Sequence, residues 1–283
     1  MRFSADLTFK IRNMKNINLN KLLFSALAIF MFSLSACKDD DDVDDVVIVV
    51  KDYTAIINLT QYVNDSVLQM NTSGFPYENA MMQKFKVTKL QYLISDLTFT
   101  KDDGTKIVDN GYHYVTLSDS ASLTYTLSSK IPAGSYSSVG FTFGFDEEDN
   151  ITGEYADLNT LGWNWPSMGM FGNLGGGYHF MRLEGDYLDS NNTSAEFKIH
   201  MGTARNDNNN PVTFEANHFD VILANSAISV ANDFNFDIEM NIEEWLQNPT
   251  TWDFNVWNAP TMPIYNAQKA LNLNGSSVFS FKK

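Results

Sequence analysis

Apolar and polar residues alternate with a period of two over many short stretches of this chain. The clearest stretch is Phe85–Leu93, which continues through Leu97–Thr100 to the turn at 102–104. This alternation is typical of half-buried β-strands. Turn residues such as Asn110-Gly111 separate similar stretches, which predict strands at 46–59, 112–117, 123–127, 139–145, 179–183, 195–201, 212–223 and 234–242. Helix is expected only in short pieces at 242–246 and 266–271.

This spacing of short strands predicts an all-β protein. We expect residues 53–283 to form one antiparallel β-sandwich, immunoglobulin-like or jelly-roll-like, with its short helical pieces near the C-terminus. No long linker rich in Pro, Ser or Gly divides the region. A single cysteine rules out an intrachain disulfide, so 21 Phe, 12 Tyr and 5 Trp must supply much of the core.

The first 37 residues have the pattern of a secretory signal. Basic residues between positions 10 and 21 precede an apolar block at 22–34, which ends in Leu34-Ser35-Ala36-Cys37. The block is too short to span a bilayer as a helix. Its last four residues resemble the bacterial lipobox, so we expect residues 1–36 to be removed and Cys37 to carry lipid. Met1 and Met14 both remain candidates for the start, and a plain secretory signal with an incidental cysteine is the alternative.

An acidic tether follows the expected lipid site. Six of the seven residues from 39 to 45 are aspartates, which repel one another and stay solvated. Cys37-Lys38-Asp39-Asp40 resembles the export signal of Bacteroidetes surface lipoproteins. We therefore expect residues 37–52 to tether an outer-membrane lipoprotein at the cell surface, with a periplasm-facing domain as the alternative.

The charge of the processed chain excludes one class of partner. Removing residues 1–36 takes away five of the 19 Lys and Arg and one of the 34 Asp and Glu, leaving a net charge of −19. A nucleic-acid backbone would be repelled by this charge, so nucleic acid is not an expected partner. Cations and basic surfaces are better suited, although acidity alone often serves only solubility.

A series of words in the second half of the chain resembles one family. In order, these are Phe141–Asp146, Trp163-Asn164-Trp165, Gly177–Gly185 and Phe197–Gly202, with matching words at 91–97, 131–136, 270–274 and 278–279. Together they resemble the MbnP-like family, which is named for a copper-binding protein associated with methanobactin. The resemblance covers roughly residues 53–283.

The resemblance implies a copper site with histidine ligands and an oxidised tryptophan (kynurenine). Trp163 and Trp165 match the family's tryptophan pair, and His200 matches its histidine before glycine. The chain departs from the pattern at two points: no Trp-X-His word is present, and Pro166–Gly177 looks like an insertion. The family fold is therefore implied more firmly than the family metal site.

Strand parity argues against a site built from two histidines. The chain has four histidines, and His200 falls on the polar face of its strand, whereas His179 shares a face with Met181 and Leu183. If these strands form a hairpin, His179 and His200 point to opposite sides unless a bulge intervenes. His113 is expected to be a satisfied core histidine, and His218 to be accessible but far from His200.

Two methionines in the inserted loop add soft ligands. Met168 and Met170 could hold Cu(I) through their thioethers, or could fill an apolar hole or form a contact patch. Imidazole and thioether together favour copper as the cofactor. Calcium is not expected, because the acidic run Asp146–Asn150 lacks the spacing of an EF-hand loop and indicates a solvated turn.

Two functions remain open from the sequence. One is a lipoprotein whose domain binds copper through His200, supported by His179 or by Met168 and Met170, with Trp163 or Trp165 as the oxidisable neighbour. The other is a metal-free interaction module that docks an unknown protein or a glycan on the same Trp/Met/Gly loop. No nucleophile elbow, metalloprotease helix, phosphate loop or cofactor fingerprint is present, so an enzyme is not expected.

Overall fold

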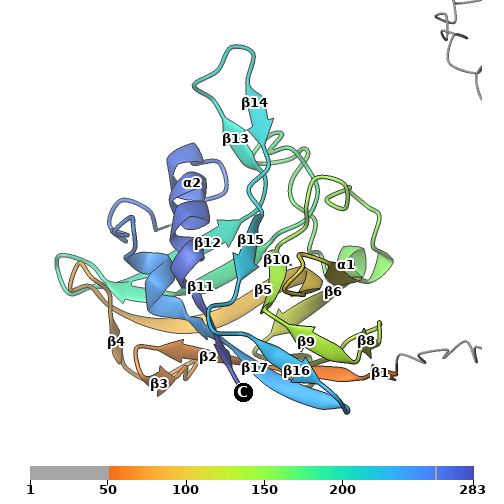
Figure 1. The fold of residues 1–283 in the computed structure, drawn as a ribbon. Helices are drawn as coiled ribbons and strands as arrows, with labels where there is room; N and C mark the ends of the chain where they lie inside the picture. Colours follow the sequence, from red (N-terminus) through yellow and green to blue (C-terminus); the bar gives the residue numbers. More distant parts are fainter. Residues whose placement is uncertain (1–50, 259) are drawn as a thin grey trace, which may run out of the picture. The chain divides into compact units, whose positions relative to one another are not determined.

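The alternating segments of the sequence form the strands of two main β-sheets, shown in Figure 1. The structure is a computed structural model that describes residues 51–258 and 260–283. The predicted signal, Cys37 and nearly all of the predicted tether lie outside these residues. Among the described residues, no helix is long and apolar enough to cross a membrane.

The larger sheet has seven strands. Its order is β12 (Ser194–Met201), β11 (Met181–Leu188), β5 (Lys84–Thr100), β10 (Ser138–Phe143) and β15 (Phe219–Ile222). Two further strands, β4 (Tyr77–Glu78) and β6 (Lys106–Thr116), also pair with β5. Its pairs are antiparallel.

The smaller sheet has five strands. It runs β18 (Phe279–Lys282), β17 (Phe234–Asn241), β2 (Ala55–Val63) and β3 (Ser66–Val67), and β7 (Thr124–Thr126) also pairs with β2. The pair of β2 and β17 is parallel, which corrects the wholly antiparallel prediction. Parallel neighbours need a long crossover, and here the whole larger sheet lies between them in the sequence.

Six strands form three small two-stranded sheets. They pair β1 (Asp52–Tyr53) with β8 (Ile131–Pro132), β9 (Gly134–Tyr136) with β16 (Ile228–Val230), and β13 (Ala204–Asn206) with β14 (Thr213–Glu215). The β13–β14 hairpin projects from the body of the domain in Figure 1. The predicted strand at 212–223 is therefore two strands, β14 and β15, in different sheets.

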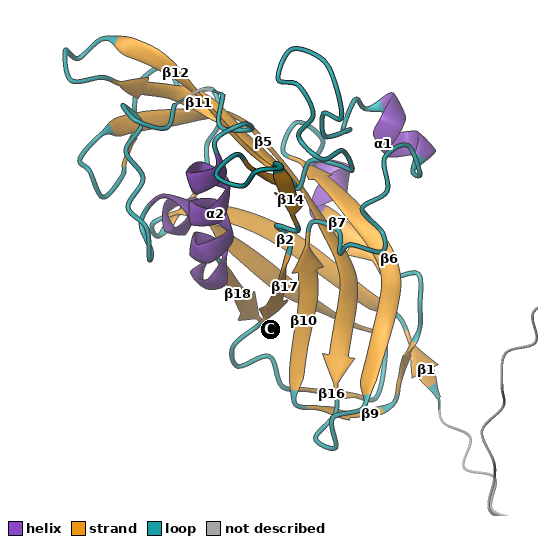
Figure 2. Ribbon diagram, turned by 90° about the horizontal axis from the view of Figure 1, so that it is seen from above, coloured by secondary structure: helices purple, strands orange, loops and turns teal. Residues whose placement is uncertain are grey.

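Helices are few and short, as predicted. They are α1 (Ala156–Thr160), α2 (Tyr265–Asn274) and 3₁₀ turns at Ser120–Leu123, Ile242–Leu246 and Gly275–Ser277. Two of these, Ile242–Leu246 and α2, fall where the sequence predicted helix, whereas α1 was not predicted. Figure 2 shows α1 and α2 well apart, on either side of β10.

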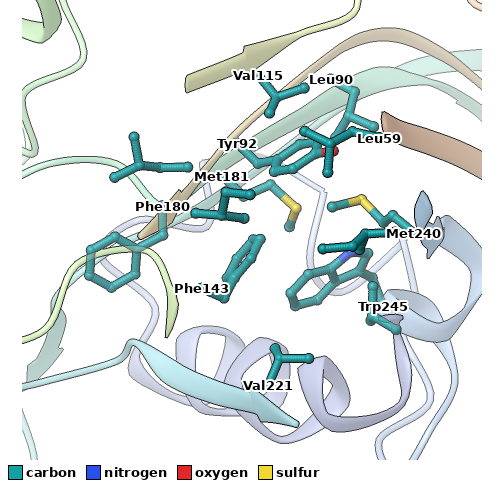
Figure 3. Close-up of a cluster of buried hydrophobic side chains, with 14 of the residues drawn as sticks. Leu59, Leu90, Tyr92, Val115, Phe143, Phe180, Met181, Val221, Met240 and Trp245 are labelled. Atoms are coloured by element: carbon teal, nitrogen blue, oxygen red, sulfur yellow. The ribbon is translucent and has the colours of Figure 1, made fainter. Parts of the chain in front are cut away.

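One large apolar core lies between the two main sheets. Figure 3 shows part of it, where Leu59 and Met240 of the smaller sheet meet Tyr92, Phe143 and Met181 of the larger one. The alternation seen in the sequence is the alternation of core-facing and outward side chains along β2, β11 and β17. The all-β sandwich prediction is therefore confirmed.

The feature that positions the candidate site is a shared strand edge. β10 and β11 pair with successive parts of the same edge of β5, and Leu93 lies between the two parts. The N–H of Leu93 donates to Phe180 O and its carbonyl accepts from Gly144 N, both at 2.9 Å. The long excursion 144–180, which contains both matched tryptophans, leaves and rejoins the sheet at this point.

Candidate metal centre

The imidazole rings of His179 and His200 lie next to each other. Their centroids are 5.3 Å apart and their planes are inclined at 74°. His179 is buried at 4% exposure, and the side chain of His200 is 14% exposed. The expectation that the two histidines point to opposite sides is therefore wrong.

The error has a simple physical cause. β11 begins at Met181, so His179 precedes the strand, and strand parity does not apply to it. The chain bends at Phe180, where β11 takes over the edge of β5. This bend turns the His179 ring toward the face that carries Arg182 and its cross-strand partner His200. The β11–β12 register is continuous from Met181 to Leu188, so the change of face lies before the strand, at residues 179–180.

Glycines at both ends of the pair allow this close arrangement. Gly177 has φ +83°, and a Cβ there would lie 2.3 Å from Asn150 Oδ1, which accepts a hydrogen bond from Tyr178 N. A Cβ on Gly202 would lie 2.5 Å from the Trp165 ring. In the family-like motifs, these two glycines therefore stand where the backbone passes too close to another group for a side chain to fit.

Both matched tryptophans pack around His179. The ring of Trp163 lies 5.4 Å and that of Trp165 4.9 Å from the His179 ring, and both indoles are almost completely buried. Backbone bonds fix them: His179 N donates to Trp163 O, and Trp165 N donates to Gly177 O. In the interaction alternative the tryptophans would belong to a contact patch, and their burial excludes them from such a patch.

The two indole N–H groups differ in their partners. Trp165 Nε1 donates to Leu174 O at 3.0 Å. Trp163 Nε1 is buried and finds no hydrogen-bond partner among the described residues. A buried donor without a partner is costly, and Trp245 Nε1 in the main core is in the same position.

A carboxylate orients His200. Nε2 of His200 lies 2.8 Å from Glu184 Oε1, and the other carboxylate oxygen of Glu184 accepts from Lys89 Nζ at 3.0 Å. Hydrogen bonds from His200, and then from Lys89, lower the pKa of Glu184 to about 2 although burial opposes this shift. Glu184 is therefore an anion that accepts a hydrogen bond from Nε2–H of His200, which leaves Nδ1 of His200 as the lone-pair nitrogen.

Two groups compete for Nδ1 of His179. It lies 3.0 Å from Trp163 O and 3.1 Å from Arg182 Nη2. One nitrogen cannot donate to the carbonyl and accept from the guanidinium at the same time. In the tautomer that donates to Trp163 O, Nε2 of His179 carries the lone pair that a metal requires.

Arg182 links His179 to Trp163. Its guanidinium carbon lies 4.5 Å from the centroid of the Trp163 ring, and Nη2 donates to Gly162 O at 2.6 Å. This cation–π contact and hydrogen bond hold the charge beside His179. Burial, followed by the charges of Arg182 and His200, lowers the pKa of His179 well below its usual value.

Both imidazoles are therefore neutral near neutral pH. Burial also lowers the pKa of His200, although its hydrogen bond to Glu184 works in the opposite direction. Neutral imidazole is the form that binds a metal. Two imidazoles that share one ion through bonds of about 2.0 Å have ring centroids at most about 6 Å apart, and the observed 5.3 Å fits this limit.

The structure offers two imidazole ligands but no complete protein ligand set. Within residues 51–258 and 260–283, no group of three or more His, Cys, Asp or Glu side chains could hold a metal. Met168 and Met170 are 80% and 90% exposed, in contrast to the buried His179. A thioether as a further ligand stays a prediction.

The other two histidines lie outside this pair. His113 is half-buried, stacks on Tyr125 and lies 2.7 Å from Ser122 O through Nε2, so it is satisfied as predicted, although it is less buried than a core residue. His218 precedes β15 and is half-buried. Neither has a ring contact with His179 or His200 among the described residues.

Arg182, Glu184 and Lys89 were missed in the sequence. Each looks like an ordinary polar residue on an alternating strand. The only available signal was the hairpin register, which places Arg182 opposite His200 and Glu184 opposite Lys198.

These features define an all-β sandwich with a buried cluster of two histidines and two tryptophans. The fold resembles the solved structure of MbnP from Methylosinus trichosporium, with a TM-score of 0.52 and 12% identity, over 82% of this chain and 99% of that one. The MbnP family model matches residues 53–263, and the chain belongs to the MbnP family. No curated protein matches the chain.

Proposed function

We propose that the domain binds one copper ion between His179 and His200. The observation that carries this proposal is the pair of buried imidazole rings 5.3 Å apart, each with a hydrogen-bond partner at one ring nitrogen. Imidazole ligands suit copper, and the hard carboxylate nearby is already engaged by His200 and Lys89. The family resemblance points to the same metal.

The residues around the histidines orient the ligands. Metal-binding histidines usually donate their second nitrogen to a carboxylate or a backbone carbonyl, which fixes the tautomer and the ring plane. Glu184 plays this part for His200, and the carbonyl of Trp163 plays it for His179 in the tautomer that carries the proton on Nδ1. Trp163 and Trp165 pack against His179, and either ring is close enough to His179 to serve as the oxidisable neighbour that the resemblance implies.

A metal-free interaction module is the second candidate. The observation in its favour is the exposure of Met168 and Met170, because adaptable methionines are common at contact surfaces. In this account the loop at 166–176 docks a protein or a glycan, and the buried histidines serve only stability.

Copper titration of the soluble domain separates the two candidates. We expect binding of one copper ion, lost in His200→Ala and in His179→Ala but kept in His218→Ala, which removes a histidine outside the pair. Circular dichroism of each variant shows whether the fold is intact. If His179→Ala and His200→Ala bind copper as well as His218→Ala does, the result supports the interaction module.

We further propose that the domain is displayed as a lipoprotein at the outer membrane. The support is the lipobox-like word before Cys37 and the acidic tether after it. Cys37→Ala is expected to abolish lipidation and membrane partitioning. Replacing residues 38–42 is expected to leave the protein anchored but shielded from protease added to intact cells. Protection of the unaltered protein contradicts surface display and leaves the periplasm-facing alternative.

A further inference from the structure

The backbone of His200 lies on the outer side of an edge strand. β12 is the last strand of the seven-stranded sheet, and its inner neighbour is β11. Met201 O points inward and accepts from Phe180 N at 2.7 Å. Because backbone groups alternate along a strand, the N–H and C=O of His200 point outward, where no strand follows.

Two side chains from the C-terminal segment take the place of that missing strand. His200 N donates to Thr261 Oγ1 at 3.0 Å, and His200 O accepts from Gln268 Nε2 at 2.7 Å. Gln268 also accepts from Gly202 N at 3.2 Å through Oε1. Both backbone groups of His200 are therefore held from the outer side.

Gln268 is well suited to this part. Its side chain is completely buried on α2, and its second amide hydrogen bonds to Thr261 O at 3.2 Å. An amide is expensive to bury unless it is fully hydrogen-bonded. The matched family region ends at residue 263, so Gln268 lies beyond it.

We propose that Gln268 and Thr261 are positioning residues that set the distance between the His200 and His179 rings. They fix the backbone of His200, while Glu184 fixes the far end of the ring. The ring is thus held at both ends, and His179 is held independently by the bend at Phe180. The consequence for copper rests on the proposed function, whereas the consequence for the ring distance does not.

The test compares two buried amides of the same helix. Gln268→Met keeps the shape and removes the hydrogen bonds to His200 and Gly202. Asn274→Leu is the matched control, because Asn274 is equally buried on α2 but bonds to Trp245 O and Thr250 O, away from the histidines. The first readout is the nuclear Overhauser effect between the His179 and His200 rings in the metal-free domain. The second is copper affinity.

We expect Gln268→Met to weaken the nuclear Overhauser effect between the two histidine rings and to lower copper affinity about 10- to 100-fold. Asn274→Leu should change neither quantity. An unchanged ring-to-ring effect in Gln268→Met overturns the proposal. If Gln268→Met does not fold, Thr261→Val is read by the same criteria. A weakened effect together with no copper binding by the unaltered domain supports the positioning role and contradicts only the proposed function.

Discussion

Glu184 is the residue on which the orientation of the His200 ring depends. Its carboxylate accepts hydrogen bonds from His200 and from Lys89, which lower its pKa to about 2 and keep it ionised near neutral pH. A charged acceptor both fixes the tautomer of the imidazole and raises its basicity as a ligand.

Replacing Glu184 by Gln should weaken copper binding about 10-fold or more, because the neutral amide is a poorer acceptor from His200. Competition with a chelator of known affinity measures the change. Glu196→Gln is the matched control, since Glu196 pairs with Lys198 at the surface of β12 and does not contact His200. Equal affinity of the two variants would show that Glu184 does not orient the ligand.

The stability of the metal-free domain should fall as the pH is lowered. The pKa values of His179 and His200 are lowered in the folded state, so below about 6.5 the unfolded chain binds more protons and gains stability relative to the folded one. The pKa of Glu184 is also lowered, so its contribution is full above about 4.5 and is lost toward 2.

Chemical denaturation at pH 7.5 and pH 5.5 measures the histidine part of this effect. We expect a lower free energy of unfolding at pH 5.5 in the unaltered domain and a smaller decrease in His179→Gln, which cannot titrate. The same decrease in both proteins would mean that His179 is not a buried neutral imidazole.

Among single residues, the sequence singled out His200 and the two tryptophans from their places in family-like motifs, and the structure brings them together around His179. Their role as a copper site stays a prediction. Arg182, Glu184 and Lys89 were not found, because a charged residue on a polar strand face has no pattern that separates a hydrogen-bonded role from a solvated one. Gln268 was hidden for a similar reason: nothing in its helix indicates that its amide reaches across to His200.

At the scale of elements, the site depends on how the loop 144–180 rejoins the sheet. The backbone at 177–180 and at 202 runs so close to other groups that a side chain at Gly177 or Gly202 would collide. This crowding holds His179 off the strand and brings Trp165 against the backbone that follows His200.

Gly202→Ala should destabilise the domain by about 1–3 kcal/mol, because the added methyl would lie 2.5 Å from the buried Trp165 ring. Urea denaturation measures this loss. Gly74→Ala is the control, since a Cβ at that position meets nothing within 4 Å. Similar free energies of unfolding for the two variants would show that Trp165 does not pack on Gly202.

Alternation predicted the limits of a strand well where the whole strand belongs to one sheet. β5 and β17 fall close to their expected limits, because their period reflects burial against a single core. The pattern does not reveal where one strand replaces another along the edge of a third. The sequence therefore placed His179 inside the strand that begins only at Met181. It also does not reveal strand partners, so the parallel pair of β2 and β17 was missed.

At the scale of the whole molecule, the sequence predicted an all-β sandwich with one large aromatic core, and this is confirmed. Composition and strand spacing suffice for this level, because any stable sandwich must bury alternate residues of both sheets. The site needed the three-dimensional structure, since its residues come from β5, β11, β12 and the loop before β11. The lipid anchor and the surface location stay predictions.

In the proposed function, His179 and His200 together hold one copper ion. X-ray absorption spectroscopy at the copper edge, on the domain loaded with one equivalent of copper, identifies the ligands of that ion. We predict scattering from two imidazole rings in the unaltered domain and from one ring or none in His200→Ala. A first shell without paired imidazoles, or a spectrum that does not change when His200 is replaced, would contradict the account.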